Sequence, residues 1–134
     1  THPNHSVFSF GIAVAPLVDW RYYDSAYTER YMNMPDANSK GYEQTSVLPN
    51  VGNLANNALL LVHGTADDNV HFMNSALLNS ALVEHNIEFE AMYYPNCDHS
   101  INTGNANRHV YRYITRFLDR KFRSSEAALE NQEL

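Results

Sequence analysis

The chain has 134 residues and a net charge of −6 at pH 7. This length accommodates at most one domain, and no apolar run is long enough to span a bilayer. The acidic balance argues against a nucleic-acid partner, because we find no basic stripe that would neutralise phosphates. The single cysteine, Cys97, excludes an internal disulfide framework.

The first predicted strand covers residues 8–16 and is mainly apolar. A short apolar run without polar alternation is typical of a strand buried on both faces, as in a parallel sheet. Pro16 ends this strand, because proline cannot donate to a sheet ladder. Further on, residues 33–57 form a long connection with one short helix predicted at 40–46, and connections of this length often carry function.

Between these segments, Asp19 is expected to cap a helix over residues 21–32. Tyr23 and Tyr27 lie four positions apart, so a helix would place them on one face, next to Trp20. Two interpretations remain open for these aromatic residues. Filling a core is the usual role of such a stripe, whereas its position after a strand end favours the lining of a pocket.

The stretch from His63 to Phe72 follows a second, wholly apolar strand at residues 58–62 and precedes a predicted helix at 74–85. Two adjacent acids before a helix, here Asp67 and Asp68, usually serve as helix caps and first-turn charges. Their place at the carboxyl end of a buried strand favours a functional role, because α/β sheets build their sites at that edge. A buried, oriented carboxylate there is the partner that a histidine base requires.

A third strand is predicted at residues 87–94, and His99 lies in the loop that follows it. The last helix is predicted at 107–122 from its apolar stripe. Residues 123–134 are charged and polar, and we expect a disordered tail there. The predicted domain therefore covers residues 1–122.

The alternation of strands and helices predicts an α/β fold with a parallel sheet and right-handed crossovers. An acid after one strand and a histidine after the next is the chain order at the end of an α/β hydrolase, whose triad runs Ser, Asp, His. The expected architecture is therefore the C-terminal part of an α/β-hydrolase fold, with an incomplete sheet.

Three segments of the sequence resemble the prolyl oligopeptidase family, most closely its dipeptidyl peptidase IV and fibroblast activation protein branch. They are Gly11-Ile-Ala-Val-Ala-Pro16 with Trp20 and Tyr22-Tyr-Asp-Ser-Ala-Tyr-Thr-Glu-Arg-Tyr31, the decapeptide His63–Phe72, and Asp98-His99 before the last helix. The decapeptide is very specific to this branch, and the resemblance covers nearly the whole chain except its tail.

The resemblance implies that Asp67 is the triad aspartate and His99 the triad histidine. It implies that Asn69 binds the backbone of the substrate's N-terminal part, whereas Asp68 would be structural, bonding loop amides. A small pocket for proline or alanine suits aromatic faces, which hold a flat ring and reject larger side chains. The pocket positions implied by the resemblance are Leu17, Trp20, Tyr23, Tyr27 and Val70.

One element of the family pattern is missing from these residues, because the nucleophile elbow needs the motif G-x-S-x-G. None of the five glycines forms it. In the family the elbow serine lies just upstream of the strand at residues 8–16, so it would fall slightly before Thr1. We therefore expect a fragment of a serine-type dipeptidyl peptidase that is inactive alone.

The resemblance implies a parent enzyme that releases X-Pro or X-Ala dipeptides from peptide N-termini. The alternative is a non-catalytic binding or dimerisation fragment, or a non-enzymatic relative. Expected partners are such peptides, the missing N-terminal part of the same chain, and a second copy through helices near 72–85 and 107–122. The parent would be anchored by one membrane span or secreted. No cofactor or metal is expected, since the histidine spacing matches no common zinc motif.

Overall fold

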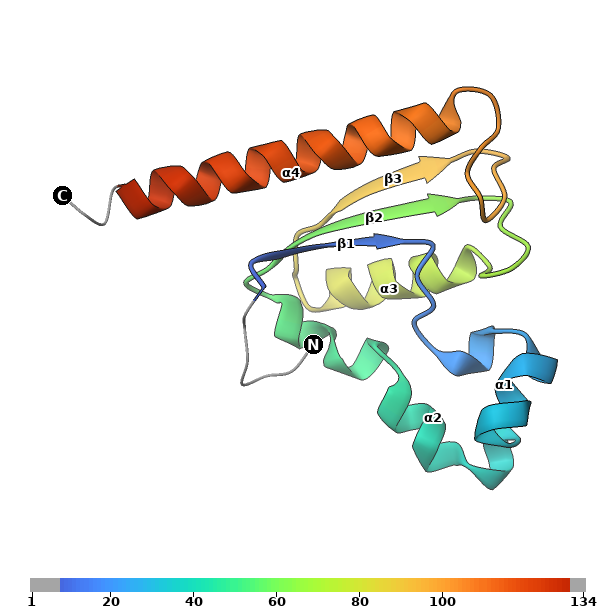
Figure 1. Cartoon of the computed structure of the whole chain (residues 1–134). Coiled ribbons are helices and arrows are strands. Elements are labelled where there is room, and N and C mark those ends of the chain that lie inside the picture. Colours follow the sequence, from blue (N-terminus) through green and yellow to red (C-terminus); the bar gives the residue numbers. More distant parts are fainter. Residues whose placement is uncertain (1–7, 131–134) are drawn as a thin grey trace.

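The computed structural model describes residues 8–130, with side chains described through Ser124. Its centre is a parallel sheet of β1 (Phe10–Val14), β2 (Ala58–Gly64) and β3 (Glu90–Tyr94), in that spatial order (Figure 1). Helices connect the strands, as parallel pairing requires. The parallel α/β class predicted from the sequence is confirmed.

Helices cover both faces of the sheet (Figure 1). The long helix α4 (Ala106–Glu130) lies on one face, and α3 (Met73–Glu84) lies on the other with the 3₁₀ helix Leu48–Leu54. Two shorter helices, α1 (Ser25–Met32) and α2 (Ser39–Thr45), lie beyond the sheet within the connection from β1 to β2. Two further 3₁₀ helices cover Trp20–Tyr22 and Pro35–Ala37.

The central strand β2 is buried on both faces, as its apolar sequence predicts. Leu60 and Val62 belong to the core cluster under α4, whereas Leu61 belongs to the cluster under α3. All three are 0% exposed, and burying each side chain stabilises the fold by about 1.5–3 kcal/mol. The other buried members are Tyr94, Cys97, Ile101, Val110 and Phe117 on the α4 side, and Val18, Val51, Leu78, Leu82 and Ile87 on the α3 side.

The first strand differs from its prediction. β1 is shorter than the predicted 8–16 stretch, its residues are only partly buried, and Val14 is 46% exposed. The reason is its position, because within residues 8–130 β1 pairs with β2 alone and is therefore an edge strand. An apolar strand sequence thus does not by itself decide whether both of its sides are covered.

The helix predicted at residues 21–32 is divided into two. The Asp19 carboxylate accepts a hydrogen bond from the Arg21 amide at 2.9 Å and caps a 3₁₀ turn. Tyr23 is extended, and Asp24 then caps α1 by accepting from the Tyr27 amide at 2.8 Å. Each of the two short acidic side chains bonds a nearby backbone amide, which competes with a continuous helix. A new helical segment therefore begins after each of them.

The last helix is longer than predicted, since α4 runs to Glu130 and residues 123–130 of the expected tail are helical. Ala127, Ala128 and Leu129 are strong helix formers, and no glycine or proline interrupts them. Residues 131–134 lie outside the described part. The other boundaries shifted by a few residues, mainly at β3, which begins at Glu90 rather than at 87.

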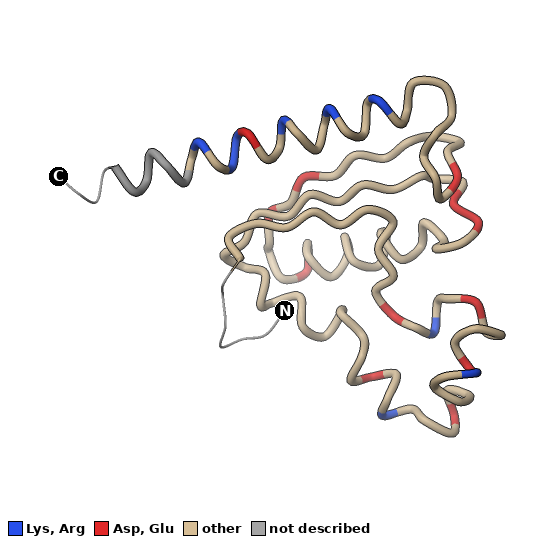
Figure 2. The backbone as a smooth tube through the Cα atoms, viewed as in Figure 1, with Lys and Arg blue, Asp and Glu red and all other residues tan. Residues whose placement is uncertain are grey.

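Helix α4 carries basic residues at regular intervals along its length, although the net charge of the chain is negative (Figure 2). Four of the five arginines of α4 recur every fourth residue, so the absence of a basic stripe assumed from the sequence is wrong for this helix. Arg120 at the end of the row pairs with Glu90 at 2.6 Å. Among the described residues, no helix is both long and apolar enough to cross a bilayer. The four arginines are Arg108, Arg112, Arg116 and Arg120.

Candidate active site

The predicted acid and histidine segments lie at the same edge of the sheet. β2 and β3 pair in parallel with Gly64 opposite Tyr94, so the loops that follow them leave side by side. We call residues 65–72 the acid loop and residues 95–105 the histidine loop. Open α/β sheets hold their ligands at this carboxyl edge.

Backbone contacts tie the two loops together. The Thr65 amide donates to the Tyr94 carbonyl at 3.0 Å, and the Ala66 amide donates to the Cys97 carbonyl at 3.0 Å. Gly64 makes this approach possible, because a Cβ atom there would lie 2.4 Å from the Cys97 carbonyl oxygen. That separation is far below van der Waals contact, so any side chain would push the loops apart.

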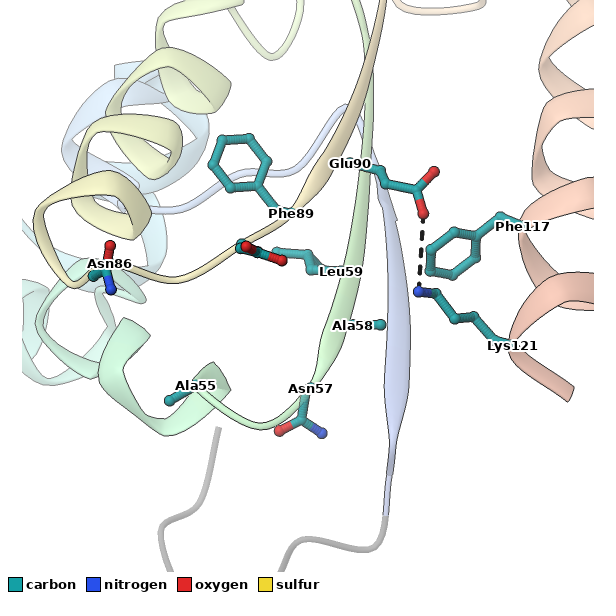
Figure 3. Close-up of a pocket in the computed structure, with 10 residues that line it drawn as sticks. Ala55, Asn57, Ala58, Leu59, Asn86, Phe89, Glu90, Phe117 and Lys121 are labelled. Carbon is teal, nitrogen blue, oxygen red and sulfur yellow. Dashed lines mark ion pairs between the residues drawn. The ribbon is translucent and has the colours of Figure 1, made fainter. Parts of the chain in front are cut away.

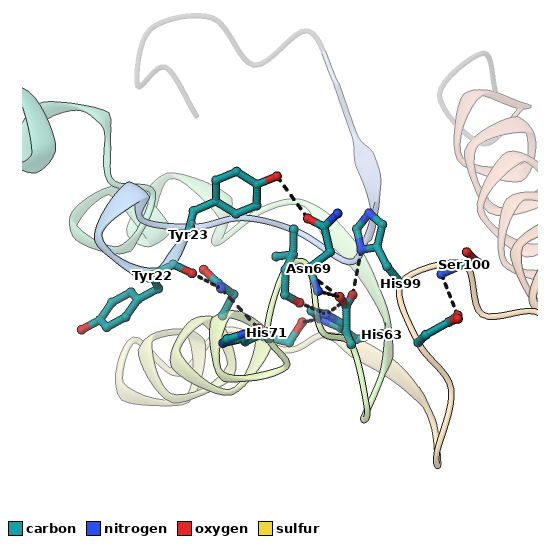
Figure 4. A network of polar contacts seen from close by, with 12 residues as sticks. Tyr22, Tyr23, His63, Asn69, His71, His99 and Ser100 are labelled. Carbon is teal, nitrogen blue, oxygen red and sulfur yellow. Dashed lines mark hydrogen bonds and ion pairs between the residues drawn. The ribbon is translucent and has the colours of Figure 1, made fainter. Parts of the chain in front are cut away.

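The two predicted triad residues, Asp67 and His99, meet across this junction, and Figure 4 shows the His99 ring in the polar network there. His99 Nδ1 lies 2.8 Å from Asp67 Oδ2, with the aspartate side chain 0% exposed and the histidine side chain 44% exposed. A buried carboxylate accepts hydrogen bonds, so the proton of His99 sits on Nδ1. That tautomer leaves Nε2 with a lone pair, which is the arrangement of a general base.

The Asp67 carboxylate is held at both oxygens. Oδ1 accepts from the Asn69 and Val70 amides at 2.9 Å each, and Oδ2 accepts from His99 and from His63 Nε2 at 3.1 Å. Burial raises the pKa of Asp67, but the hydrogen bonds from His99 and the Asn69 amide, with the electrostatic attraction of the two imidazole rings, outweigh it and lower the pKa below its usual value. The group is therefore an anion at neutral pH.

The three predicted aromatic residues form one cluster, which we call the aromatic cluster. The Trp20 and Tyr27 rings stack with centroids 6.3 Å apart, and Tyr23 meets both edge-on at 6.0 and 5.6 Å. They come together although Tyr23 precedes α1 rather than lying in it. Tyr27 is 51% exposed, so within the described structure the cluster is a surface feature and not core packing.

The aromatic cluster borders a pocket of about 420 Å³ that reaches the acid loop. Tyr23 Oη donates to Asn69 Oδ1 at 3.1 Å, which joins the cluster to the loop (Figure 4). Acidic and aromatic side chains therefore face the same space. The lining residues are Tyr23, Asp24, Tyr27, Asp68 and Asn69.

The other predicted pocket residues lie near this space without lining it. Trp20 contacts the pocket tyrosines through their rings, Val70 is buried, and Leu17 is half-buried. Their contact with a substrate stays a prediction. Asp68 lines the pocket instead of bonding loop amides, because Asp67 accepts those amides.

Two buried polar groups of the site were missed from the sequence. His63 is 0% exposed, and its Nδ1 lies 2.7 Å from Ser75 Oγ. Asn74 is also 0% exposed; its Oδ1 accepts from the Val18 amide at 3.2 Å, and its Nδ2 donates to the Tyr22 carbonyl at 3.3 Å. The available signal was an adjacent polar pair in the first turn of α3, together with a histidine next to the end of an apolar strand.

A second pocket, of about 480 Å³, lies around the opposite ends of β2 and β3 (Figure 3). Its charged groups pair across it, with Lys121 Nζ 3.9 Å from Glu90 Oε1. In the part of the chain that the structure describes, no group of three His, Cys, Asp or Glu side chains is arranged to hold a metal. The lining residues are Ala55, Asn57, Ala58, Leu59, Asn86, Glu88, Phe89, Glu90, Phe117 and Lys121.

Comparison with known proteins finds peptidases. The chain is 45% identical over 118 residues to dipeptidyl peptidase 4 of Bos taurus, which covers 87% of this chain and 15% of that protein. It is 43% identical over 122 residues to prolyl endopeptidase FAP of Mus musculus, covering 90% of this chain and 16% of that protein. The chain thus spans about one sixth of the length of the relatives that it matches.

Solved structures give the same result. The crystal structure of Porphyromonas gingivalis dipeptidyl peptidase 4 superposes with a TM-score of 0.80 at 48% identity, covering 83% of this chain and 16% of that one. A putative dipeptidyl aminopeptidase IV from Bacteroides ovatus superposes with a TM-score of 0.80 at 29% identity, covering 85% of this chain and 16% of that one. Residues 1–125 match the family model described as Prolyl oligopeptidase family. The chain therefore belongs to the prolyl oligopeptidase family.

Proposed function

We propose that the chain is the C-terminal part of the catalytic domain of a serine-type dipeptidyl peptidase. The contact of 2.8 Å between His99 Nδ1 and the buried Asp67 carboxylate carries this proposal. In a Ser-His-Asp triad the aspartate fixes the histidine tautomer and stabilises the imidazolium. His99 Nε2 would take the proton of the serine hydroxyl as it attacks the peptide carbonyl, and would then give that proton to the leaving amine.

The serine of this proposal belongs to a part of the longer protein outside these 134 residues, because the sequence contains no G-x-S-x-G motif. His99 also lines an open pocket of about 260 Å³ between the end of β1 and α4, next to the exposed side chains of Val14 and Tyr111. A segment that carries the nucleophile has room there. Without that segment, Asp67 and His99 have no group to activate, and the chain alone would be inactive.

The proposed substrates are peptides with proline or alanine in the second position. Tyr23 and Tyr27 present aromatic faces to the 420 Å³ pocket, and a flat, apolar ring packs well on such faces. The Asn69 side chain at the same pocket offers an amide for the backbone of the peptide. The relatives named dipeptidyl peptidase 4 support this substrate class.

The remaining parts of the proposal concern assembly and location. Helices α3 and α4 would contribute to a homodimer of the longer protein, and that protein would be membrane-anchored or secreted. Both ideas come from the family resemblance alone. The alternative function, a non-catalytic binding or dimerisation piece, is disfavoured by the bonded Asp67–His99 pair, which a binding role does not need.

The first test is to sequence the source transcript upstream of Thr1. A frame that continues into G-x-S-x-G supports the peptidase proposal. A replaced serine overturns it in favour of a binding relative, and a transcript that truly begins here overturns the enzyme proposal for this product.

The second test uses the longer protein with an Xaa-Pro chromogenic amide. Asp67→Asn and His99→Ala should each lower kcat by about 10³- to 10⁴-fold. Asp119→Asn, an exposed acid on α4, is the matched control and should retain wild-type activity. Full activity of either triad variant would overturn the assignment.

A further inference from the structure

The Asp67 carboxylate has a second histidine beside it, on the buried side. His63 is the penultimate residue of the core strand β2 and is 0% exposed, whereas the His99 side chain is 44% exposed. Both rings bond the same oxygen, Oδ2, at 3.1 and 2.8 Å. The chemistry proposed above assigns a role to His99 only, so the buried ring needs its own explanation.

The partners of His63 determine where its proton lies. Nε2 is 2.8 Å from the Val70 carbonyl oxygen, and a carbonyl can only accept, so Nε2 carries the hydrogen. That N–H is shared between the Val70 carbonyl and Asp67 Oδ2. Nδ1 lies 2.7 Å from Ser75 Oγ. With the hydrogen on Nε2, Nδ1 is the acceptor nitrogen and takes a hydrogen bond from the Ser75 hydroxyl.

The ring is also fixed by packing. Phe72 meets His63 edge-on with centroids 5.6 Å apart, and Phe72 meets Tyr93 edge-on at 4.9 Å. Ser75 is itself 0% exposed and lies in the first turn of α3. The imidazole therefore has neither a free rotation nor a free choice of tautomer.

We propose that His63, with its Nε2–H fixed by the Val70 carbonyl and its Nδ1 held by Ser75, is a positioning residue that orients the Asp67 carboxylate toward His99. The backbone amides of the acid loop fix Oδ1, and without a second donor Oδ2 could turn about that fixed point. The His63 N–H holds Oδ2 where His99 Nδ1 reaches it. The kinetic consequence rests on the proposed peptidase function, whereas the hydrogen-bond arrangement does not.

The test uses the longer protein that carries this chain, with kcat and KM measured separately. His63→Phe keeps a flat ring without the donor and should lower kcat about tenfold, with KM within about twofold of wild type. His63→Gln can place an amide N–H near the Nε2 position and should restore most of the loss. Ser75→Ala leaves His63 Nδ1 without its hydroxyl partner, so the ring is held less firmly and kcat should fall about threefold. Ser80→Ala, an exposed serine on the same helix, should change nothing.

Proton NMR of the imidazole N–H region gives an independent readout in the same protein. The wild type should show one slowly exchanging N–H from His63 and one hydrogen-bonded N–H from His99. The His99 signal should move in Ser75→Ala and in His63→Phe but not in Ser80→Ala. A purely structural role for His63 would alter the unfolding midpoint and leave both kcat and this signal unchanged.

The outcomes separate the two proposals. An inactive wild type with an intact G-x-S-x-G serine contradicts the peptidase function, while the NMR comparison still tests the orientation of Asp67. An active wild type whose Ser75→Ala variant keeps its kcat and its His99 signal overturns the positioning role alone. The positioning role is also overturned if kcat of His63→Gln is as low as kcat of His63→Phe. Should His63→Phe fail to fold, Ser75→Ala decides, because it removes only one hydroxyl.

Discussion

The acid loop and the aromatic cluster share one edge of the molecule, but they are held in different ways. Asp67 is fixed by hydrogen bonds at both carboxylate oxygens and is buried. Tyr27 contacts its neighbours mainly through ring edges and faces and is half exposed. The difference indicates that the geometry proposed for catalysis is rigidly specified, whereas the surface proposed for binding tolerates more change.

The largest expected effect comes from Gly64→Ala, which places a methyl group at the junction of the acid and histidine loops. The new methyl group would overlap the Cys97 carbonyl, and backbone there cannot yield without breaking the loop hydrogen bonds. We expect a loss of roughly 3–5 kcal/mol in the free energy of unfolding, measured by urea denaturation.

Gly11→Ala is the matched control for this change, since it also lies in a strand and its Cβ would meet Leu59 at an ordinary 3.9 Å. Equal denaturation midpoints for the two variants would show that the loop junction is not tight.

Asn74→Ala should have the next largest effect, because this residue links the acid-loop side to the segment that carries the aromatic cluster. Its loss leaves the Val18 amide without its buried acceptor. We expect the free energy of unfolding to fall by about 1–3 kcal/mol. We also expect Trp20 to become more mobile, which its fluorescence would report. Asn56→Ala, an exposed asparagine, is the control, and an Asn74→Ala variant as stable as this control would contradict the linking role.

Tyr27→Ala tests the aromatic cluster, the less rigidly held of the two compared regions. It removes an exposed ring from the pocket, so stability should change little, while KM of the longer protein for an Xaa-Pro substrate should rise about five- to tenfold with kcat nearly constant. Met34→Ala, which also truncates an exposed apolar side chain but lies away from the described pockets, is the control. A fall in kcat with unchanged KM would mean that the aromatic cluster acts on chemistry rather than on binding.

The smallest expected effect is on the pH dependence of stability. Folding lowers the pKa of Asp67, so the anion contributes stability above the unfolded pKa of about 3.9 and loses it as pH falls through the lower folded value. The free energy of unfolding should therefore decline on the acid side less steeply in Asp67→Asn than in the wild type. Parallel slopes in urea titrations from neutral pH downward would argue against this coupling.

Much of the site was predictable because its signals are local. The apolar run before Asp67, and the placement of His99 after the next strand, predicted their meeting at one edge, and the structure brings them to 2.8 Å. The aromatic residues were also grouped correctly, although the helix that was expected to align them is broken before Tyr23. The family resemblance favoured Asp67 over Asp68 as the partner of His99, and the structure brings Asp67 and His99 together. The amide bonding expected of Asp68 was wrong, because Asp67 accepts the Asn69 and Val70 amides.

The sequence by itself determined the order of strands and helices, the parallel α/β class and the two loops that carry the acid and the histidine. These follow from hydrophobic patterns and chain punctuation within short windows. Only the tertiary structure decided that β1 is partly exposed, that Gly64 must lack a side chain and that His63 and Ser75 stand behind Asp67. Each of these depends on which distant residues pack together, and residue spacing within one segment does not encode that.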